Sequence, residues 1–415
     1  IAVGYNISNE KFWQPIKPVI SNLKIRGSWG LVGNDATNAG RFAYMEDLVL
    51  GGSDSYTTGI RQDTYYSGPS WNRYFNPDLT WEVGEKINLG LDLQLFNDFN
   101  LTFDIFREKR RDIFMTRENS IPEIVGTGET KITSNNGEME NKGLDLAIDY
   151  NKQITKDFFL SFKSTLTFAR NKVLKMDESP YFEYPGLSDV GHPLGTYWGY
   201  VADGLFPDQE TIDNSPRQDL GYTPQPGDIK YVNQPNAKGE YDNVINSNDR
   251  VAIGHPYDPE LVYGFGPSIR WKNLDFSFFF QGVAKTSLFM SGFHPFGDNS
   301  LRNVLQFVAN DRWSPTNQNV DAKYPRLTRK TSLNNTNPGN SGRTSDYWMR
   351  DGSFLKLKNM ELGYTFKRMR FYISGSNLLT FSKFDLWDPE QGGGSGLKYP
   401  TQRVFNVGFQ MTFNN

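Results

Sequence analysis

The segment "RVFNVGFQMTFNN" (residues 403–415) consists of two interleaved sets of residues. The residues of the apolar set are Phe405, Val407, Phe409, Met411 and Phe413. The residues of the other set are Val404, Asn406, Gly408, Gln410 and Thr412. Alternation with a period of two indicates a β-strand with two different faces. The apolar face of this strand must contact either the core of a soluble sandwich or lipid.

The same alternation recurs along the chain and predicts an all-β protein with about eleven strands. The predicted strands are residues 1–9, 21–31, 85–96, 99–106, 143–150, 158–168, 260–271, 274–284, 353–366, 369–381 and 401–413. Most are long enough to cross a bilayer, since a tilted strand needs about 9–11 residues to do so. The alternation is imperfect at 353–366, where Lys356 and Lys358 share a face with Phe354 and Met360. We expect these lysines to reach out of an apolar band towards water.

Short and long connections alternate along the predicted strands. The short ones are residues 97–100, 151–157, 271–273 and 366–369, and the long ones lie near 32–79, 117–131, 172–259, 290–352 and 382–400. In an antiparallel meander this order puts all short turns at one end and all long loops at the other. Transmembrane barrels have that polarity, with the long loops extracellular, whereas sandwiches use Greek-key crossings.

Aromatic residues gather near the ends of the predicted strands, as they do in the girdles of membrane barrels. They are Trp81, Trp271, Tyr347, Trp348, Tyr364, Phe366 and Phe381. The strand count is odd, whereas bacterial single-chain barrels generally have an even number of strands. Either the count is off by one, or the chain supplies about 11 strands of a larger barrel whose N-terminal part lies outside residues 1–415. Doubling eleven gives the 22 strands of plugged outer-membrane transporters.

Composition excludes several other classes of protein. The chain has 415 residues, 37% of them hydrophobic, and no run of eighteen apolar residues that would form a transmembrane helix. A formal net charge of −3 with balanced signs argues against nucleic acid as a partner. Cysteine is absent, which excludes disulfides, thiolate metal sites and a cysteine nucleophile.

No catalytic, cofactor-binding or metal-binding residue is predicted. Each of the three histidines, His192, His255 and His294, precedes a proline in or near a long loop and has no carboxylate at metal-ligand spacing. The glycine-rich "GTGETK" (126–131) lacks the later residues of a phosphate loop. Asp388 and Glu390 in "WDPE" could be posed as a glycosidase pair, but Pro389 between them favours a turn.

Binding is a better-supported role for the loops than catalysis. Aromatic rings beside polar groups suit sugars, peptides or a protein lid. The residues predicted to face a ligand or partner are Trp71, Trp198, Trp313 and Trp387 with Asp388. A place in a girdle or in a loop core explains each of them equally well. The polar side chains expected to line a hydrated lumen or hold a plug are Lys24, Arg26, Asp92, Asp104, Asp145, Asp149 and Arg370.

Several stretches resemble the SusC/RagA family, the TonB-dependent outer-membrane transporters of Bacteroidetes. They are "LKIRGSWGLVGND" (23–35), "NPDLTWEVGEKINLGLDLQLF" (76–96), "NNGEMENKGLDLAIDY" (135–150), "GTYWGYVADGLF" (195–206), "NDRWSPTNQNVDAKYPRL" (310–327), "SDYWMRDGSFLKLKNMELGYTF" (345–366), "LLTFSKFDLWDPE" (378–390) and "YPTQRVFNVGFQMTF" (399–413). The similarity runs nearly end to end and in family order. It implies that the chain is the C-terminal half of the barrel.

The resemblance also implies a mechanism and partners. Such a barrel encloses a plug, pairs with a SusD-like surface lipoprotein, and imports an oligosaccharide or peptide when the TonB complex pulls on the plug. Outer-membrane lipid would surround it. Many relatives carry a calcium-like loop where this chain has residues 227–254. Here Asp228, Asp242 and Asp249 are too scattered for that spacing, and we expect no calcium site.

Two alternatives remain open at this stage. One is a secreted soluble all-β glycan-binding protein or glycoside hydrolase that uses the same aromatic loops. The other is an outer-membrane barrel that serves adhesion or scaffolding rather than import. Solubility without detergent would support the first of these. The choice between glycan and peptide as the ligand does not follow from loop composition.

Overall fold

A computed structural model describes residues 1–36, 42–51, 55–117, 119, 121, 124, 132–178, 183–291, 304–328 and 344–413. Its main feature is one antiparallel sheet of eleven strands in which neighbours in the sheet follow one another along the chain. The strands are β1 (Ala2–Asn6), β2 (Ile20–Asn34), β7 (Glu82–Leu95), β8 (Phe99–Thr116), β9 (Thr133–Thr155), β10 (Phe158–Lys175), β17 (Leu261–Trp271), β18 (Leu274–Ala284), β21 (Phe354–Phe366), β22 (Met369–Ser382) and β23 (Val404–Met411). The predicted all-β meander and its number of strands are confirmed.

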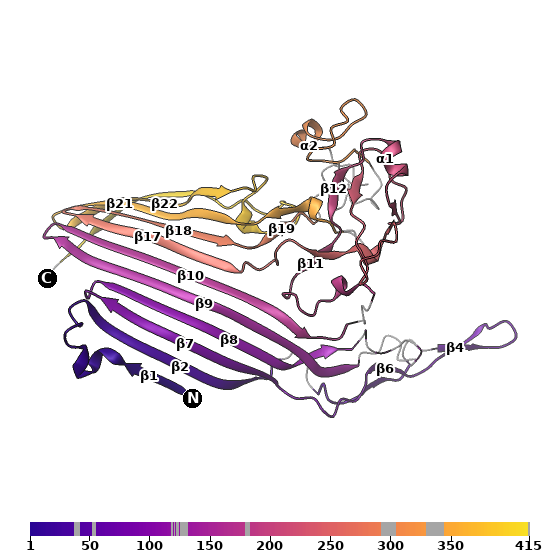
Figure 1. Ribbon diagram of the computed structural model, residues 1–415, viewed down its shortest axis with the longest axis horizontal. Coiled ribbons are helices and arrows are strands. Elements are labelled where there is room, and N and C mark those ends of the chain that lie inside the picture. The colour runs from indigo at the N-terminus through magenta and orange to yellow at the C-terminus, as the bar shows by residue number, and fades with distance from the viewer. Residues whose placement is uncertain are drawn as a thin grey trace.

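The connections alternate as the sequence predicts. Two-residue turns join β9 to β10, β17 to β18 and β21 to β22, and a three-residue turn joins β7 to β8. The predicted long connections lie at the opposite end of the strands, whereas residues 7–19, which join β1 to β2, lie at the same end as the turns (Figure 1). We call these two ends of the sheet the turn end and the loop end. Each strand bound lies within a few residues of its predicted position, except in β8, β9 and β10.

These three strands are longer than predicted and extend the sheet at the loop end. β8 and β10 each have 18 residues and β9 has 23. Their extensions are rich in charged residues, so apolar alternation does not mark them. They are joined instead by ion pairs such as Lys109–Glu138 at 2.9 Å. The loop predicted near 117–131 therefore starts at its expected place but lies between longer strands.

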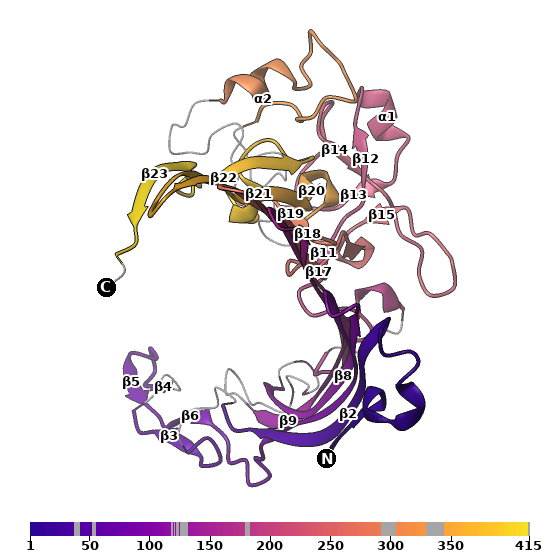
Figure 2. The same cartoon turned by 90° about the vertical axis from the view of Figure 1, so that its left-hand side faces the viewer.

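The sheet curves into an open arc with β1 and β23 at its two edges (Figure 2). Its polar face carries Arg26, Asp104 and Asn406, while Ile25, Ile105 and Phe405 belong to the apolar face. On the apolar face these side chains are 49%, 53% and 75% exposed. A hollow of about 430 Å³ opens on the polar face, which makes this face the inner side of the arc. The predicted division of the last strand into two faces is confirmed.

A β-bulge explains the imperfect alternation in β21. Leu357 pairs with Phe280 and Asn359 pairs with Phe279, so Lys358 is an extra residue between them. A bulge places two consecutive residues opposite one residue of the neighbouring strand. Before Lys358 the inner face of β21 is formed by even-numbered residues, and after Lys358 it is formed by odd-numbered residues.

The long loops form a layer of short strands and helices at the loop end (Figure 1). Their paired strands are β3 (Asp47–Val49) with β6 (Ser70–Arg73), β4 (Ser55–Thr58) with β5 (Thr64–Ser67), β11 (Tyr197–Gly199) with β16 (Val251–Ile253), β12 (Ala202–Leu205) with β14 (Ile229–Tyr231), β13 (Arg217–Gln218) with β15 (Val244–Ile245), and β19 (Ser287–Phe289) with β20 (Met349–Asp351). The helices are α1 (Gln209–Asp213) and α2 (Gln306–Asn310). Among the described residues no helix is both long and apolar enough to span a membrane.

The main hydrophobic core lies in this loop layer rather than in the sheet. It combines the connections β10–β17, β18–β21 and β22–β23. The buried residues of the cluster are Tyr200, Leu205, Leu220, Ile229, Tyr231, Ile245, Leu288, Phe289, Met290, Val308, Trp313, Ala322, Tyr324, Trp348 and Phe384. Three segments far apart in the sequence thus form one packed unit, which we call the loop core.

The predicted aromatic girdle needs one correction. Trp81 and Trp271 are 65% and 55% exposed, and Tyr364, Phe366 and Phe381 are also exposed on the strands. Trp348 is fully buried in the loop core, and Tyr347 packs against that core. The two residues precede β20, which is a strand of the loop layer. They therefore lie in the loop layer and not at the end of a strand of the main sheet.

Candidate functional site

Two arginines on the polar face each connect three strands. Arg26 of β2 donates to both carboxylate oxygens of Asp92 at 3.0 Å and to Asp104 at 2.9 Å. Gly90 lies between Arg26 and Asp104 in the register. A Cβ at Gly90 would lie 2.5 Å from Asp104 and 2.7 Å from the guanidinium of Arg26. Glycine is therefore needed at this position for the guanidinium to cross the strand.

Arg370 of β22 repeats this arrangement at the other side of the arc. It donates to Asp275 of β18 at 3.1 Å and to Glu361 of β21 at 2.6 Å. Gly363 lies beneath these groups, since a Cβ there would lie 2.5 Å from Asp275. The sequence pattern placed Arg26, Asp92, Asp104 and Arg370 on the inner face. It missed the partners of Arg370, whose pairing depends on the register of the strands.

The other polar residues predicted for the inner face lie there without forming one cluster. Asp145 accepts a hydrogen bond from Thr167 at 2.7 Å, and Asp149 lies 3.9 Å from Lys163. Lys24 lies opposite Asp92 in the register. The inner face is therefore a charged wall.

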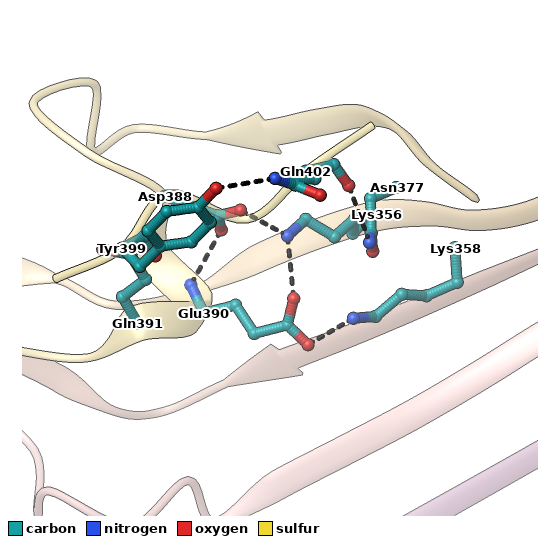
Figure 3. Close-up of polar contacts among 8 residues, drawn as sticks. All are labelled: Lys356, Lys358, Asn377, Asp388, Glu390, Gln391, Tyr399 and Gln402. Atoms are coloured by element: carbon teal, nitrogen blue, oxygen red, sulfur yellow. Dashed lines mark hydrogen bonds and ion pairs between the residues drawn. The ribbon is translucent and has the colours of Figure 1, made fainter. Parts of the chain in front are cut away.

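Asp388 belongs to a charge cluster that ties the last loop to the sheet (Figure 3). The Lys356 ammonium donates to Asp388 at 2.6 Å and to Glu390 at 2.8 Å. Lys358 also pairs with Glu390. The Lys356 side chain is 1% exposed, so the expectation that it reaches out to water is wrong. It is buried beneath the loop and compensated there by two carboxylates.

The same carboxylates form the turn that "WDPE" predicts. Asp388 caps the 3₁₀ turn Pro389–Gln391 by accepting from the backbone N–H of Glu390 at 3.1 Å. Burial raises the pKa of Asp388, but the hydrogen bonds from Lys356 and from the Glu390 backbone, together with the charge of Lys356, hold the pKa below its ordinary value. The pKa of Glu390 is likewise lowered, against the effect of burial, by Lys356 and Lys358. Two ionised carboxylates bound to lysines are poorly suited to act as a general acid.

Two of the predicted loop tryptophans are packed into the loop layer. Trp313 is 4% exposed in the loop core. Trp387 packs edge-on against Phe384, with ring centroids 4.6 Å apart, and donates to the carbonyl of Gly392 at 2.9 Å. These contacts describe a structural role for both rings. Their prediction as ligand-facing or partner-facing residues stays a prediction.

The other two tryptophans are not part of the loop core. The indole N–H of Trp198 donates to Asp189 at 2.5 Å, and its ring contacts His192 at a centroid distance of 5.0 Å. Trp71 of β6 is 37% exposed and stacks on Tyr74 at 5.7 Å. Trp313 and Trp387, with Asp388 beside it, meet at the loop core, whereas Trp71 and Trp198 lie outside that cluster, so the five residues are not brought together into one site. The prediction for Trp198 and Trp71 also remains to be tested.

The acidic residues of segment 227–254 have partners within the protein. Asp228 is 1% exposed and accepts a bidentate pair from Arg326 at 2.6 and 3.2 Å. Asp249 accepts from the backbone of Asn246 and Gln234, each at 2.7 Å. Burial raises the pKa of Asp249. No group of three or more acidic, histidine or cysteine side chains suited to a metal ion occurs in the described part of the chain.

The two remaining sequence features include residues that the structure does not describe. "GTGETK" (126–131) lies outside the described residues, and so does His294. Within the described part, the backbone N–H of His255 donates to the hydroxyl of Ser287 at 2.8 Å. That contact anchors the connection between β16 and β17 to β19.

Comparison with known proteins gives the family of the chain. Residues 22–378 match the family model described as "TonB dependent receptor-like, beta-barrel". The TonB-dependent receptor P3 of Formosa agariphila is 27% identical over 99% of this chain and 41% of its own length. The TonB-dependent receptor SusC of Bacteroides thetaiotaomicron is 27% identical over 100% of this chain and 40% of its own length. The chain thus spans about two fifths of these curated relatives.

Solved structures agree with the fold. A structure described as the RagAB peptide transporter superposes with a TM-score of 0.72 at 21% identity, covering 99% of this chain and 43% of that chain. The match supports the curved antiparallel sheet with its loop layer. The family model argues against the secreted soluble alternative, because the barrels of that family lie in the outer membrane. The family model covers most of the chain, and the chain therefore belongs to the TonB-dependent receptor-like β-barrels, which lie in the outer membrane.

Proposed function

We propose that this chain is the C-terminal part of the barrel of an active outer-membrane importer. The full protein would take up an oligosaccharide or a peptide with a SusD-like surface lipoprotein, using energy delivered by the TonB complex. The observation that carries this proposal is the division of the sheet. Its inner face is a charged wall joined by Arg26 and Arg370, and its outer face exposes apolar side chains suited to lipid.

The loop layer supports the same proposal. Its buried core gives the loop end a folded platform rather than a set of separate loops. The Lys356–Asp388–Glu390 cluster attaches that platform to the wall of the barrel. A rigid rim of this kind suits a surface lipoprotein that closes over the barrel. The exposed ring of Trp71 is our choice for a contact with ligand or partner, ahead of the more enclosed rings of Trp198, Trp313 and Trp387.

Uptake by cells that carry the full-length protein tests the proposal. Labelled oligosaccharides and labelled peptides are supplied separately. The accumulation of each is compared with that in cells that carry a variant of the full-length protein without its TonB-binding segment. We expect one ligand class to accumulate only with the intact segment. The matched control is Lys163→Gln, which removes an exposed inner-face charge (70% side-chain exposure) and should leave uptake intact.

The possible outcomes separate import from the scaffold alternative. Accumulation that is unchanged by the deletion would contradict active import. Surface binding without accumulation of either class would favour an adhesion or scaffolding role. Equal dependence of both classes on the segment would support import but leave the barrel without selectivity between peptide and glycan. The absence of enzymatic activity is a separate prediction, checked by recovering the ligand chemically unchanged.

A further inference from the structure

The outer face of the sheet changes abruptly from apolar to basic at the loop end of β7–β10. Leu89, Ile105, Leu144 and Phe168 lie side by side in one apolar row across the four strands. The next outward-facing row towards the loop end contains Ile87 followed by three cations. Those cations are Arg107, Lys142 and Arg170. Two residues of strand separate the rows, which is about 7 Å.

The basic residues continue for two further rows on the same face. The register puts Lys109 and Lys172 in the second row, on either side of Glu140, and it puts Arg111 and Lys175 in the third, where Glu138 lies opposite Lys175. We call Arg107, Lys109, Arg111, Lys142, Arg170, Lys172 and Lys175 the basic belt. The belt side chains with a printed value are between 37% and 59% exposed. The belt lies on the long strands that project at the loop end (Figure 1).

Carboxylates neutralise only part of the belt, and in its second row Lys109 pairs with Glu138 at 2.9 Å. Glu140 pairs with Arg107 and, at 2.6 Å, with Lys142. Glu260 pairs with Arg170 at 2.6 Å. Like charges on neighbouring strands destabilise a sheet, and these two glutamates offset that cost in the first row.

Three cations of the belt have weaker compensation. Arg111 lies 3.9 Å from Asp112, and Lys175 lies opposite Glu138, whose ion pair is with Lys109. No ion pair within 4 Å is found for Lys172 among the described residues. The acidic groups on or beside the belt are Asp112, Glu85, Glu138, Glu140 and Glu260. Cations therefore remain in excess next to the apolar band.

We propose that the basic belt binds the phosphate groups of anionic glycolipid in the outer leaflet of the membrane. Short turns of such barrels are periplasmic and long loops extracellular, so the belt stands at headgroup level of the outer leaflet. Lysine and arginine next to a lipid-facing band interact with anionic headgroups at about 1 kcal/mol each. Their long stems lie along the apolar surface while the charges reach the headgroups.

The belt is local rather than a general property of the sheet. At the loop end of β21 and β22 the outward positions are held by Leu355, Leu379 and Phe381 instead of cations. This part of the outer face is therefore apolar at the loop end, where β8–β10 are basic. The phosphate-binding sector is thus confined to the long strands β8–β10, and it gives a reason for their outward-facing charged extensions.

Full-length protein in nanodiscs tests the proposal. The discs contain zwitterionic phospholipid with either phosphorylated lipid A or its dephosphorylated form. The test variant carries Arg111→Gln, Lys172→Gln and Lys175→Gln, which leaves the ion pairs of Glu140 and Glu260 intact. The control variant removes three inner-face charges by Lys24→Gln, Lys86→Gln and Lys163→Gln. Native mass spectrometry measures the glycolipid retained by each protein.

We expect the unaltered protein and the control to retain phosphorylated lipid A over the dephosphorylated form. The test variant should lose affinity for the phosphorylated form by about fivefold per cation, on the order of a hundredfold in total. Equal retention of both forms by the unaltered protein would overturn the proposal, as would unchanged retention in the test variant or an equal loss in the control. The single variant Lys172→Gln, expected to lose about fivefold, covers the case in which the triple variant fails to assemble.

Discussion

Two phenylalanines show how differently the two regions of this molecule are stabilised. Phe409 of β23 is 56% exposed on the sheet, whereas Phe289 of β19 is 5% exposed in the loop core. Both are in strands. The first lies on the face that meets lipid, so its surroundings are supplied by the membrane. The second is enclosed by segments of its own chain, as in a soluble domain.

The sheet and the loop layer are stabilised by different interactions. The sheet is held by its continuous ladder of backbone hydrogen bonds and by charges on its inner face. The loop layer is held by side-chain packing and by buried ion pairs such as Arg326–Asp228. A substitution should therefore have different consequences in the two regions. The predictions that follow, in order of decreasing effect, test this distinction.

The largest effect is expected where the two regions meet. Lys356→Met removes the cation between Asp388 and Glu390 and leaves two carboxylates under the loop. Breaking a buried pair in this way costs about 3–5 kcal/mol. We expect the loop after β22 to be cleaved faster by a protease added outside cells. Lys163→Met, at an exposed inner-face position, should leave cleavage unchanged, and equal cleavage of both variants would remove the special role of the cluster.

The next effect contrasts the two faces of the last strand. Val407→Arg places a cation on the lipid-facing side, which costs about 2–4 kcal/mol near the membrane midplane. Asn406→Arg, one residue away, points a cation into the hydrated lumen and should cost much less. The measurement is the urea concentration at which each variant unfolds in lipid vesicles. A larger loss for Asn406→Arg would reverse the assignment of the faces.

A smaller effect tests packing in the loop core. Gly227 has a φ of +84°, and a Cβ there would lie 2.3 Å from the ring of Trp313. Gly239 has a similar φ of +81° with no atom within 4 Å of an added Cβ. Both alanine variants carry the backbone cost. We expect Gly227→Ala to lose about 1–3 kcal/mol more, measured as the difference in thermal stability of the loop layer.

The smallest effect is the dependence of the loop anchor on pH. The folded-state pKa values of Asp388 and Glu390 lie below their ordinary values of 3.8 and 4.5. Their contribution to stability is therefore complete above those values and is lost as the pH falls through the lowered ones. Protease cleavage of the last loop should rise on acidification. In Glu390→Gln the rise should be shallower, and an equally steep rise would assign it to other carboxyls.

The sheet could be predicted from sequence because each strand carries its own signal. Alternating residues such as Phe405 and Val407 mark a strand whichever neighbour it pairs with, and short turns mark its partner. The loop core has no such signal. Trp313 and Trp348 become buried only because three connections that are distant in the sequence pack together. The spacing of residues within any one connection does not predict that packing.

The charged parts of the site were partly predictable for a related reason. Alternation placed Arg26 and Asp92 on the inner face, since parity alone decides the face. It could not give the partners of Lys356, because Asp388 and Glu390 approach it from a loop 32 and 34 residues later. Parity also failed at Lys358, where one extra residue shifts the pattern.

That extra residue has a consequence for how such strands vary. Removing Lys358 would restore a regular alternation of the two faces in the sequence of β21. The strand would then lose the contact of Lys358 with Glu390. A sequence made more regular would thus encode a less well anchored protein. The irregular position in the alternation is thus informative, because it marks the point at which β21 is attached to the last loop.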